Sequence, residues 1–164
     1  MTLRAVYSNW PMIQQHVRDR VATLSDDQLL LQSGQDRWPM WAIVGHMACQ
    51  RVFWLYDFAG EPRVETRFTN AAYNCPGDDD LENVLSSAEL VAELDSTFGL
   101  IEGILDRWPI ASLDEVLRRP EWDESWVHTR GVVVQRSFGH DVWHTADLND
   151  TLGRHGLEGI DIWN

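Results

Sequence analysis

The sequence contains no lysine, and all thirteen of its basic residues are arginine. Lysine forms the Schiff bases of carbonyl and pyridoxal chemistry, and a lysine contacts the phosphates in P-loop nucleotide-binding proteins. Both chemistries are therefore excluded. The sequence also lacks a glycine-rich phosphate-binding loop and a recognisable Ser-His-Asp arrangement. We therefore expect neither a nucleotide-phosphate site nor a serine hydrolase.

Cysteine and long apolar runs are scarce as well. Two cysteines in 164 residues cannot form the disulfide framework of a small secreted domain. No apolar run approaches the roughly 18 residues that a membrane-spanning helix needs. The first twenty residues have no apolar centre of the kind found in signal peptides. These absences predict a cytoplasmic protein that does not enter a membrane.

The charge is strongly one-sided, because 13 basic residues face 26 acidic ones and the net charge is −13. A protein this acidic repels phosphate backbones and anionic lipid surfaces. We therefore expect no nucleic acid and no membrane among its partners, and we expect a small-molecule substrate instead. The length, the 44% hydrophobic content and the nine tryptophans predict one globular domain over residues 1–164.

Helical periodicity dominates the chain. In four segments, apolar residues recur at spacings of three and four, which places them on one face of a helix. The predicted helices cover residues 10–24, 39–59, 87–107 and 130–152. Capping boxes at Ser25–Gln28 and Ser86–Glu89 mark two helix starts, and Gly153 is expected to end the last helix.

Four amphipathic helices with little strand signal predict an all-α fold, a four-helix bundle. The long segment 61–85 contains Pro62, Pro76 and an acidic run, and it predicts a crossover between two helix pairs. Residues 122–129 alternate weakly between apolar and polar side chains. This pattern fits a short strand or an extended loop.

Three of the six histidines form a candidate metal site. His140 and His144 are four residues apart, so both imidazoles can reach one metal ion from the same side of a helix. This spacing alone is weak evidence, because such pairs also arise by chance. A catalytic site commonly has a third ligand, and His46 in the most apolar predicted helix is the candidate. A core histidine satisfied by one hydrogen bond is the commoner interpretation of a lone histidine such as His46.

The segments WPMWAIVGHMACQRVFWL and GHDVWHTADLNDTL together resemble the DinB/YfiT-like superfamily. Members of that superfamily are four-helix bundles in which one histidine of the second helix and a His-x-x-x-His pair of the fourth hold a metal. The resemblance implies that His46, His140 and His144 are the ligands. Three neutral imidazoles suit Zn²⁺, Ni²⁺, Fe²⁺ or Co²⁺, and the sequence does not choose among them.

Several residues near these histidines have open roles. Asp141 is the first candidate for a carboxylate that orients a metal-binding imidazole, and a plain helix-surface acid is the alternative. Many members of the superfamily have a Gly-Gln-Leu-like ending after the last histidine, where this chain has Asp147 before a leucine. That difference leaves the role of Asp147 open. Cys49 is a candidate ligand or, more commonly, a small core residue. Cys75 is expected to be an unpaired thiol.

Two classes of function fit these observations. The first is a metalloenzyme, either a hydrolase that uses metal-bound water or a transferase that holds a low-molecular-weight thiol as thiolate. The resemblance implies both chemistries. The second is a non-catalytic, stress-associated metal-binding module. The tryptophan content and the resemblance also predict a homodimer, because some tryptophans of so small a bundle must lie near its surface.

Overall fold

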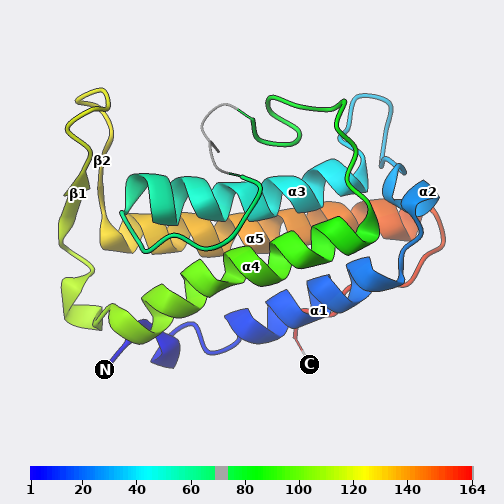
Figure 1. Ribbon diagram of the computed structural model, residues 1–164. Helices are drawn as coiled ribbons and strands as arrows, with labels where there is room; N and C mark the ends of the chain where they lie inside the picture. Colours follow the sequence, from blue (N-terminus) through cyan, green and yellow to red (C-terminus); the bar gives the residue numbers. More distant parts are fainter. Residues whose placement is uncertain (69–73, 164) are drawn as a thin grey trace.

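The computed structural model describes residues 1–68 and 74–163 and is dominated by helices (Figure 1). Its long helices are α1 (Trp10–Thr23), α3 (Met40–Arg51), α4 (Ser87–Arg107) and α5 (Arg130–Arg154). Its shorter elements are α2 (Asp26–Leu29), β1 (Val116–Arg118), β2 (Val127–Thr129) and 3₁₀ turns at Leu3–Ala5 and Ile110–Ser112. Residues 69–73 of the predicted crossover lie outside the described residues. The all-α fold is confirmed.

Local capping fixes where the helices begin. Both predicted capping boxes form, because the Ser25 side chain caps α2 and the Ser86 side chain caps α4. In each box, the side chain three residues later accepts a hydrogen bond from the backbone N–H of the serine. Thr129 caps α5 by accepting a hydrogen bond from the backbone N–H of Val132. These caps satisfy backbone donors that have no partner within a first helical turn.

Two helices differ in detail from the sequence-based expectation. The predicted helix 39–59 is α-helical over α3 and continues as a π-helix over Val52–Phe58. Gly153 does not end α5. The helix continues to Arg154, and Gly156 adopts a positive φ of 67° just beyond it. The N–H of Leu157 then bonds to the carbonyl of Leu152 at 2.9 Å, which closes the helix end in the way that a left-handed glycine permits.

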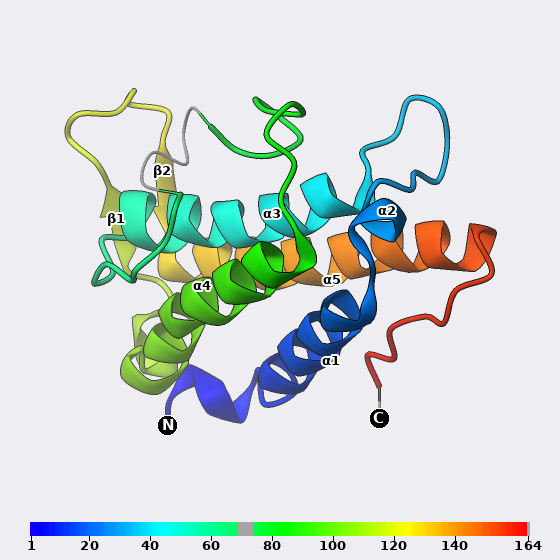
Figure 2. The same ribbon diagram turned by 45° about the vertical axis from the view of Figure 1, so that its right-hand side comes forward.

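The long helices pack as a bundle in which α1 and α5 run in one direction and α3 and α4 run in the other (Figure 1). Helix α4 packs against α1 and α3, and α5 packs against α3 and α1 (Figure 2). Because the neighbours α3 and α4 point the same way, the chain between them has to return along the bundle. The predicted crossover between two helix pairs is therefore confirmed.

A small hairpin joins α4 to α5. Strands β1 and β2 pair antiparallel, with Val116 opposite Thr129, so the segment that fitted a strand or a loop supplies one short strand. Its His128 ring packs against Trp54 and Phe58 of the π-helix, at centroid distances of 5.5 and 5.4 Å. The hairpin thus covers the far end of the helix that begins as α3.

A buried ion pair crosses the middle of the core. Arg51 on α3 is 2% exposed, and its guanidinium donates to the Asp141 carboxylate of α5 at 2.9 Å. The same guanidinium donates to the Gln14 side chain of α1 and to the Leu94 carbonyl of α4. The Trp10 indole N–H donates to Asp141 at 2.7 Å. All four long helices are therefore joined by hydrogen bonds that compensate two buried charges.

Among the described residues, no helix combines the length and the apolar character that crossing a bilayer requires.

Candidate metal centre

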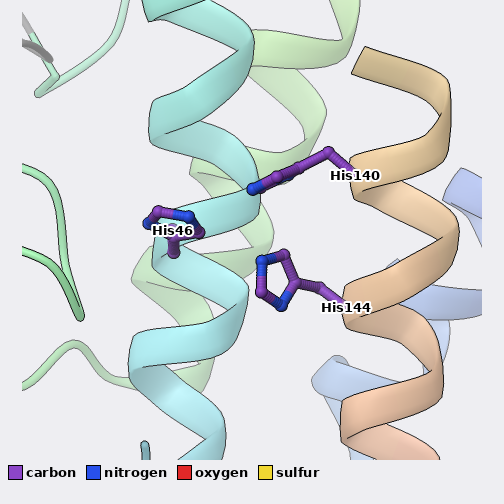
Figure 3. Close-up of side chains that lie close together, drawn as sticks. All are labelled: His46, His140 and His144. Carbon is purple, nitrogen blue, oxygen red and sulfur yellow. The ribbon is translucent and has the colours of Figure 1, made fainter. Parts of the chain in front are cut away.

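The three predicted histidines lie together between α3 and α5. Figure 3 shows the rings of His140 and His144 extending from α5 toward His46 on α3. The ring centroids are 4.9 Å apart for His46 and His140, 5.1 Å for His46 and His144, and 4.4 Å for His140 and His144. One nitrogen from each ring lies within 4.8 Å of the others. This spacing allows a single ion to contact all three rings.

His46 is fixed from behind by a turn of the crossover. The ring is 5% exposed, and its Nδ1 lies 3.1 Å from the carbonyl oxygen of Pro76. A carbonyl only accepts hydrogen bonds, so Nδ1 carries the proton and Nε2 keeps a free lone pair for a metal. The Asp78 carboxylate lies 3.5 Å from the same Nδ1.

The turn that contacts His46 is tied to α3 by a disulfide between Cys49 and Cys75. The prediction of an unpaired Cys75 thiol is therefore wrong, and Cys49 is not a thiolate ligand in this structure. The two cysteines are 26 residues apart in sequence. They meet because the crossover returns over α3 one turn beyond His46.

His144 is oriented from its own helix. Its Nδ1 lies 2.9 Å from the carboxylate of Asp147, one turn further along α5. A carboxylate oxygen accepts a hydrogen bond, so Nδ1 of His144 carries the proton. Nε2 of His144 is then the nitrogen left for a metal. The role that the sequence left open for Asp147 is thus that of a carboxylate behind a candidate ligand. The Trp38 indole stacks beside the His144 ring with a centroid distance of 6.2 Å.

Asp141 does not have the role that was expected of it. Its carboxylate is 1% exposed and accepts hydrogen bonds from Arg51 on α3 and Trp10 on α1. The prediction that it orients a candidate ligand is corrected accordingly. Its cationic partner Arg51 comes from α3 and could not be read from the sequence of α5 alone.

Burial favours the neutral form of two candidate ligands, His46 and His140. Desolvation lowers the pKa of His46, and the nearby Asp78 carboxylate opposes part of that decrease. Desolvation lowers the pKa of His140 further, to about 2, with additional repulsion from His144, His46 and Arg51. Neutral imidazole is the form that binds a metal ion.

An open cavity of about 430 Å³ lies beside the histidines on α5. His140 and His144 form part of its wall, and the loop before α3, Ile43 on α3 and other residues of α5 form the rest. Small-molecule sites commonly have volumes of roughly 300–1,000 Å³. Its other notable lining residues are Asp36, Arg37, Trp38, Trp143, Asp147 and Asp150.

The remaining histidines lie away from the cluster. His16 is half-buried and His155 is exposed, and their rings hydrogen-bond to the backbone oxygens of Asp161 and Gln32, respectively. His128 belongs to the aromatic contacts of the hairpin. None of these three rings belongs to the histidine cluster.

Sequence reasoning missed the supporting residues Pro76 and Asp78. A backbone carbonyl carries no side-chain signature, and the path of the crossover does not follow from periodicity. The one available signal was the presence of a single possible partner for Cys75 in the whole sequence.

Comparison with known proteins agrees with this fold. A model of the DinB superfamily matches residues 12–148. The crystal structure of a DinB-like protein from Bacillus cereus ATCC 10987 is similar at a TM-score of 0.70 and 10% identity, over 99% of this chain and 98% of that one. At that identity the likeness shows the fold alone. No curated protein matches the chain. The family match spans most of the sequence, and this chain belongs to the DinB superfamily.

Proposed function

We propose that this chain is a metal-dependent enzyme. His46, His140 and His144 hold one divalent ion, and a small-molecule substrate binds in the adjoining cavity. One observation carries the proposal: His140 and His144 belong both to the histidine cluster and to the wall of a cavity of about 430 Å³. The free face of the site therefore opens into a space of ligand size, as expected of a catalytic and not of a closed structural site.

The donor set fits a divalent transition metal. All three candidate ligands are imidazoles, and in His46 and His144 the acceptors at Nδ1 leave Nε2 available. Zn²⁺, Ni²⁺, Fe²⁺ and Co²⁺ all accept such a set. A bound ion with an open position supplies Lewis acidity, which activates either a water molecule or a thiol at neutral pH.

The residues of the cavity supply binding and orientation. Trp38 and Trp143 present flat apolar surfaces, and Trp143 is 71% exposed at the rim. Arg37 and Asp36 offer charges of both signs near the entrance. Two reactions fit this arrangement: hydrolysis of a small substrate, and transfer of a low-molecular-weight thiol to an electrophile. The non-catalytic, stress-associated metal-binding module is the alternative that experiment has to exclude.

Metal reconstitution followed by activity screening tests the proposal. The protein is stripped with a chelator, reloaded separately with Zn²⁺, Ni²⁺ or Fe²⁺, and analysed for metal per chain. We expect one ion per chain in the wild type and in the control variants His16→Ala and His155→Ala. We expect almost no metal in His140→Ala and His144→Ala, because each variant keeps only two of the three imidazole ligands.

The loaded protein is then screened for hydrolysis and for thiol transfer, and the activity should follow metal content across the variants. Equal metal content in the wild type and in the variant lacking all three histidines would refute the metal site. Stoichiometric metal binding without turnover, and without a change in metal spectra when thiols or substrate analogues are added, would favour the non-catalytic module.

The expected homodimer remains a prediction. The exposed indoles of Trp143 and Trp163, at 71% and 81%, are consistent with an apolar contact between copies. Light scattering at micromolar concentration tests it, and a monomeric mass would contradict it.

A further inference from the structure

We propose that the Cys49–Cys75 disulfide is a redox switch that controls how His46 is held, and through it the affinity of the histidine site for metal. The inference rests on the proposed function, because it concerns regulation of the same site. It follows from the positions of the two cysteines, each of which lies close in sequence to a residue of the His46–Pro76 contact. Cys49 lies one turn beyond His46 on α3, and Cys75 directly precedes Pro76, whose carbonyl oxygen contacts the His46 ring.

Residues 75–80 form a compact turn, here named the 75–80 turn. The backbone N–H of Cys75 donates to the Asp79 carboxylate at 3.0 Å, and the Asp79 N–H donates to the Cys75 carbonyl at 2.9 Å. The Gly77 N–H donates to the Asp80 carbonyl at 3.0 Å. Because these bonds join Cys75 to the residues that follow it, a movement of Cys75 also moves Pro76.

The 75–80 turn rests closely on the site. A Cβ atom added at Gly45 would lie 2.9 Å from Cγ of Pro76, so the absence of a side chain lets the turn approach α3. Gly77 has a φ of 86°, and a Cβ there would lie 2.7 Å from the Trp38 ring. Trp38 in turn packs edge-on against His46 at 4.9 Å. The turn therefore contacts both His46 and the indole beside it.

Opening the disulfide requires this turn to move. Cys49 is fully buried and Cys75 is 1% exposed, so a reductant cannot reach either sulfur while the turn is seated. In the reaction, two equivalents of a low-molecular-weight thiol each give up a hydrogen atom. The S–S bond between Cys49 and Cys75 breaks, two S–H bonds form, and the small thiol becomes its disulfide. The reverse reaction consumes the small disulfide as oxidant.

The oxidised and reduced states differ in their support of His46. With the disulfide closed, the Pro76 carbonyl fixes the Nδ1–H form of the ring and aims Nε2 at the other histidines. With the disulfide open, the tether of the turn is lost. Removing such a partner from a metal-binding histidine typically lowers metal affinity about 10–100-fold. Coupling is reciprocal, so bound metal should also protect the disulfide from reduction by the same factor.

The test compares metal affinity in the two redox states of the whole chain. Affinity for Zn²⁺ is measured by competition with a chelating dye, before and after reduction with a phosphine, which unlike an added thiol does not compete strongly for the metal. We expect affinity to fall about tenfold or more on reduction. Cys75→Ser should show the weaker affinity in both conditions. Circular dichroism confirms that each sample keeps its helices.

A second readout does not depend on metal. Nitrogen chemical shifts of the imidazoles, measured on the metal-free protein, report which ring nitrogen carries the proton. Reduction should change the shifts of His46 and leave those of His128, which is remote from the turn, unchanged.

The outcomes separate the two proposals. A loss of Zn²⁺ affinity together with a change at His46 supports the switch. Unchanged His46 shifts, or changed shifts with equal affinity in both states, would overturn it. If Zn²⁺ binds in neither state, the proposed function fails, and the His46 shifts alone then decide whether the disulfide controls this ring.

Discussion

The two helices that supply the candidate ligands support them in different ways. On α5, the spacing of His140 and His144 is set by the helix, and the carboxylate behind His144 is only three residues away at Asp147. On α3, His46 depends on Pro76, which lies 30 residues further along the chain in a turn tied down by a disulfide. One half of the site is therefore local, and the other depends on tertiary contacts. Substitutions far from the ligands can therefore disturb the tertiary half of the site.

The largest expected effect comes from breaking the ion pair that joins the two halves. Arg51→Met leaves the Asp141 carboxylate buried without its cation. Breaking a buried pair from one side typically costs about 3–5 kcal/mol. We expect a loss of that size in the free energy of unfolding, measured by urea denaturation, and a weakening of both halves of the site.

Two further variants serve as controls for this prediction. Arg18→Met removes an exposed pair with Asp95 and should leave stability unchanged. The double variant Arg51→Met with Asp141→Leu should regain much of the lost stability, because no uncompensated charge remains. A single Arg51→Met variant as stable as the wild type would contradict the assigned role of the pair.

The local half can be weakened by one carboxylate. Asp147→Asn removes the acceptor that fixes the His144 ring, and Zn²⁺ affinity should fall about 10–100-fold. Asp150 lines the same cavity but pairs with Arg154, so Asp150→Asn is the matched control and should change affinity little. Equal losses in both variants would indicate a general charge effect instead of an oriented ring.

The tertiary half can be tested with a pair of glycines that each precede a candidate ligand. Gly45→Ala introduces a methyl group against Pro76 and should displace the 75–80 turn, lowering Zn²⁺ affinity about tenfold. Gly139 precedes His140 and has open space around it, so Gly139→Ala should keep affinity. It should also raise stability by about 0.5–1 kcal/mol, because alanine favours helix. A similar affinity in both variants would argue against the support from the turn.

The smallest expected effect concerns His128, outside both halves. Burial, followed by the charge of Arg136, lowers the pKa of His128 below that of the unfolded chain. As the pH falls, the unfolded chain therefore takes up the proton first. The neutral His128 ring makes its full contribution to the free energy of unfolding above about pH 6.5, and this contribution is lost as the pH falls below that value. The stability difference between wild type and His128→Gln should shrink from pH 7.5 to pH 5.5. A constant difference would contradict this assignment.

The sequence predicted the local half better than the tertiary half, for a physical reason. Helical periodicity fixes the spacing of His140 and His144, because this relation depends on one helix alone. His46 needed the resemblance to a family, since nothing in the sequence of α3 says which helix it faces. The capping boxes at Ser25 and Ser86 were equally predictable, because they are interactions within a single turn.

Two of the errors fall where two distant segments meet, and the third concerns a helix end. Both roles considered for Asp141, a carboxylate behind a ligand and a helix-surface acid, missed its partner Arg51, which lies 90 residues away on α3. Cys75 was taken as unpaired because the path of the crossover, which brings it to Cys49, is not encoded in any periodic pattern. The end of α5 was placed at Gly153, whereas the positive φ that closes the helix belongs to Gly156.

The most direct test of the central claim is anomalous diffraction from crystals of the protein loaded with Co²⁺ or Zn²⁺. We predict one strong peak between α3 and α5, bonded to imidazole nitrogens of His46, His140 and His144 at about 2.0–2.2 Å, with at least one position open toward the cavity. A peak bonded to other residues, or no peak between these rings at saturating metal, would contradict the account.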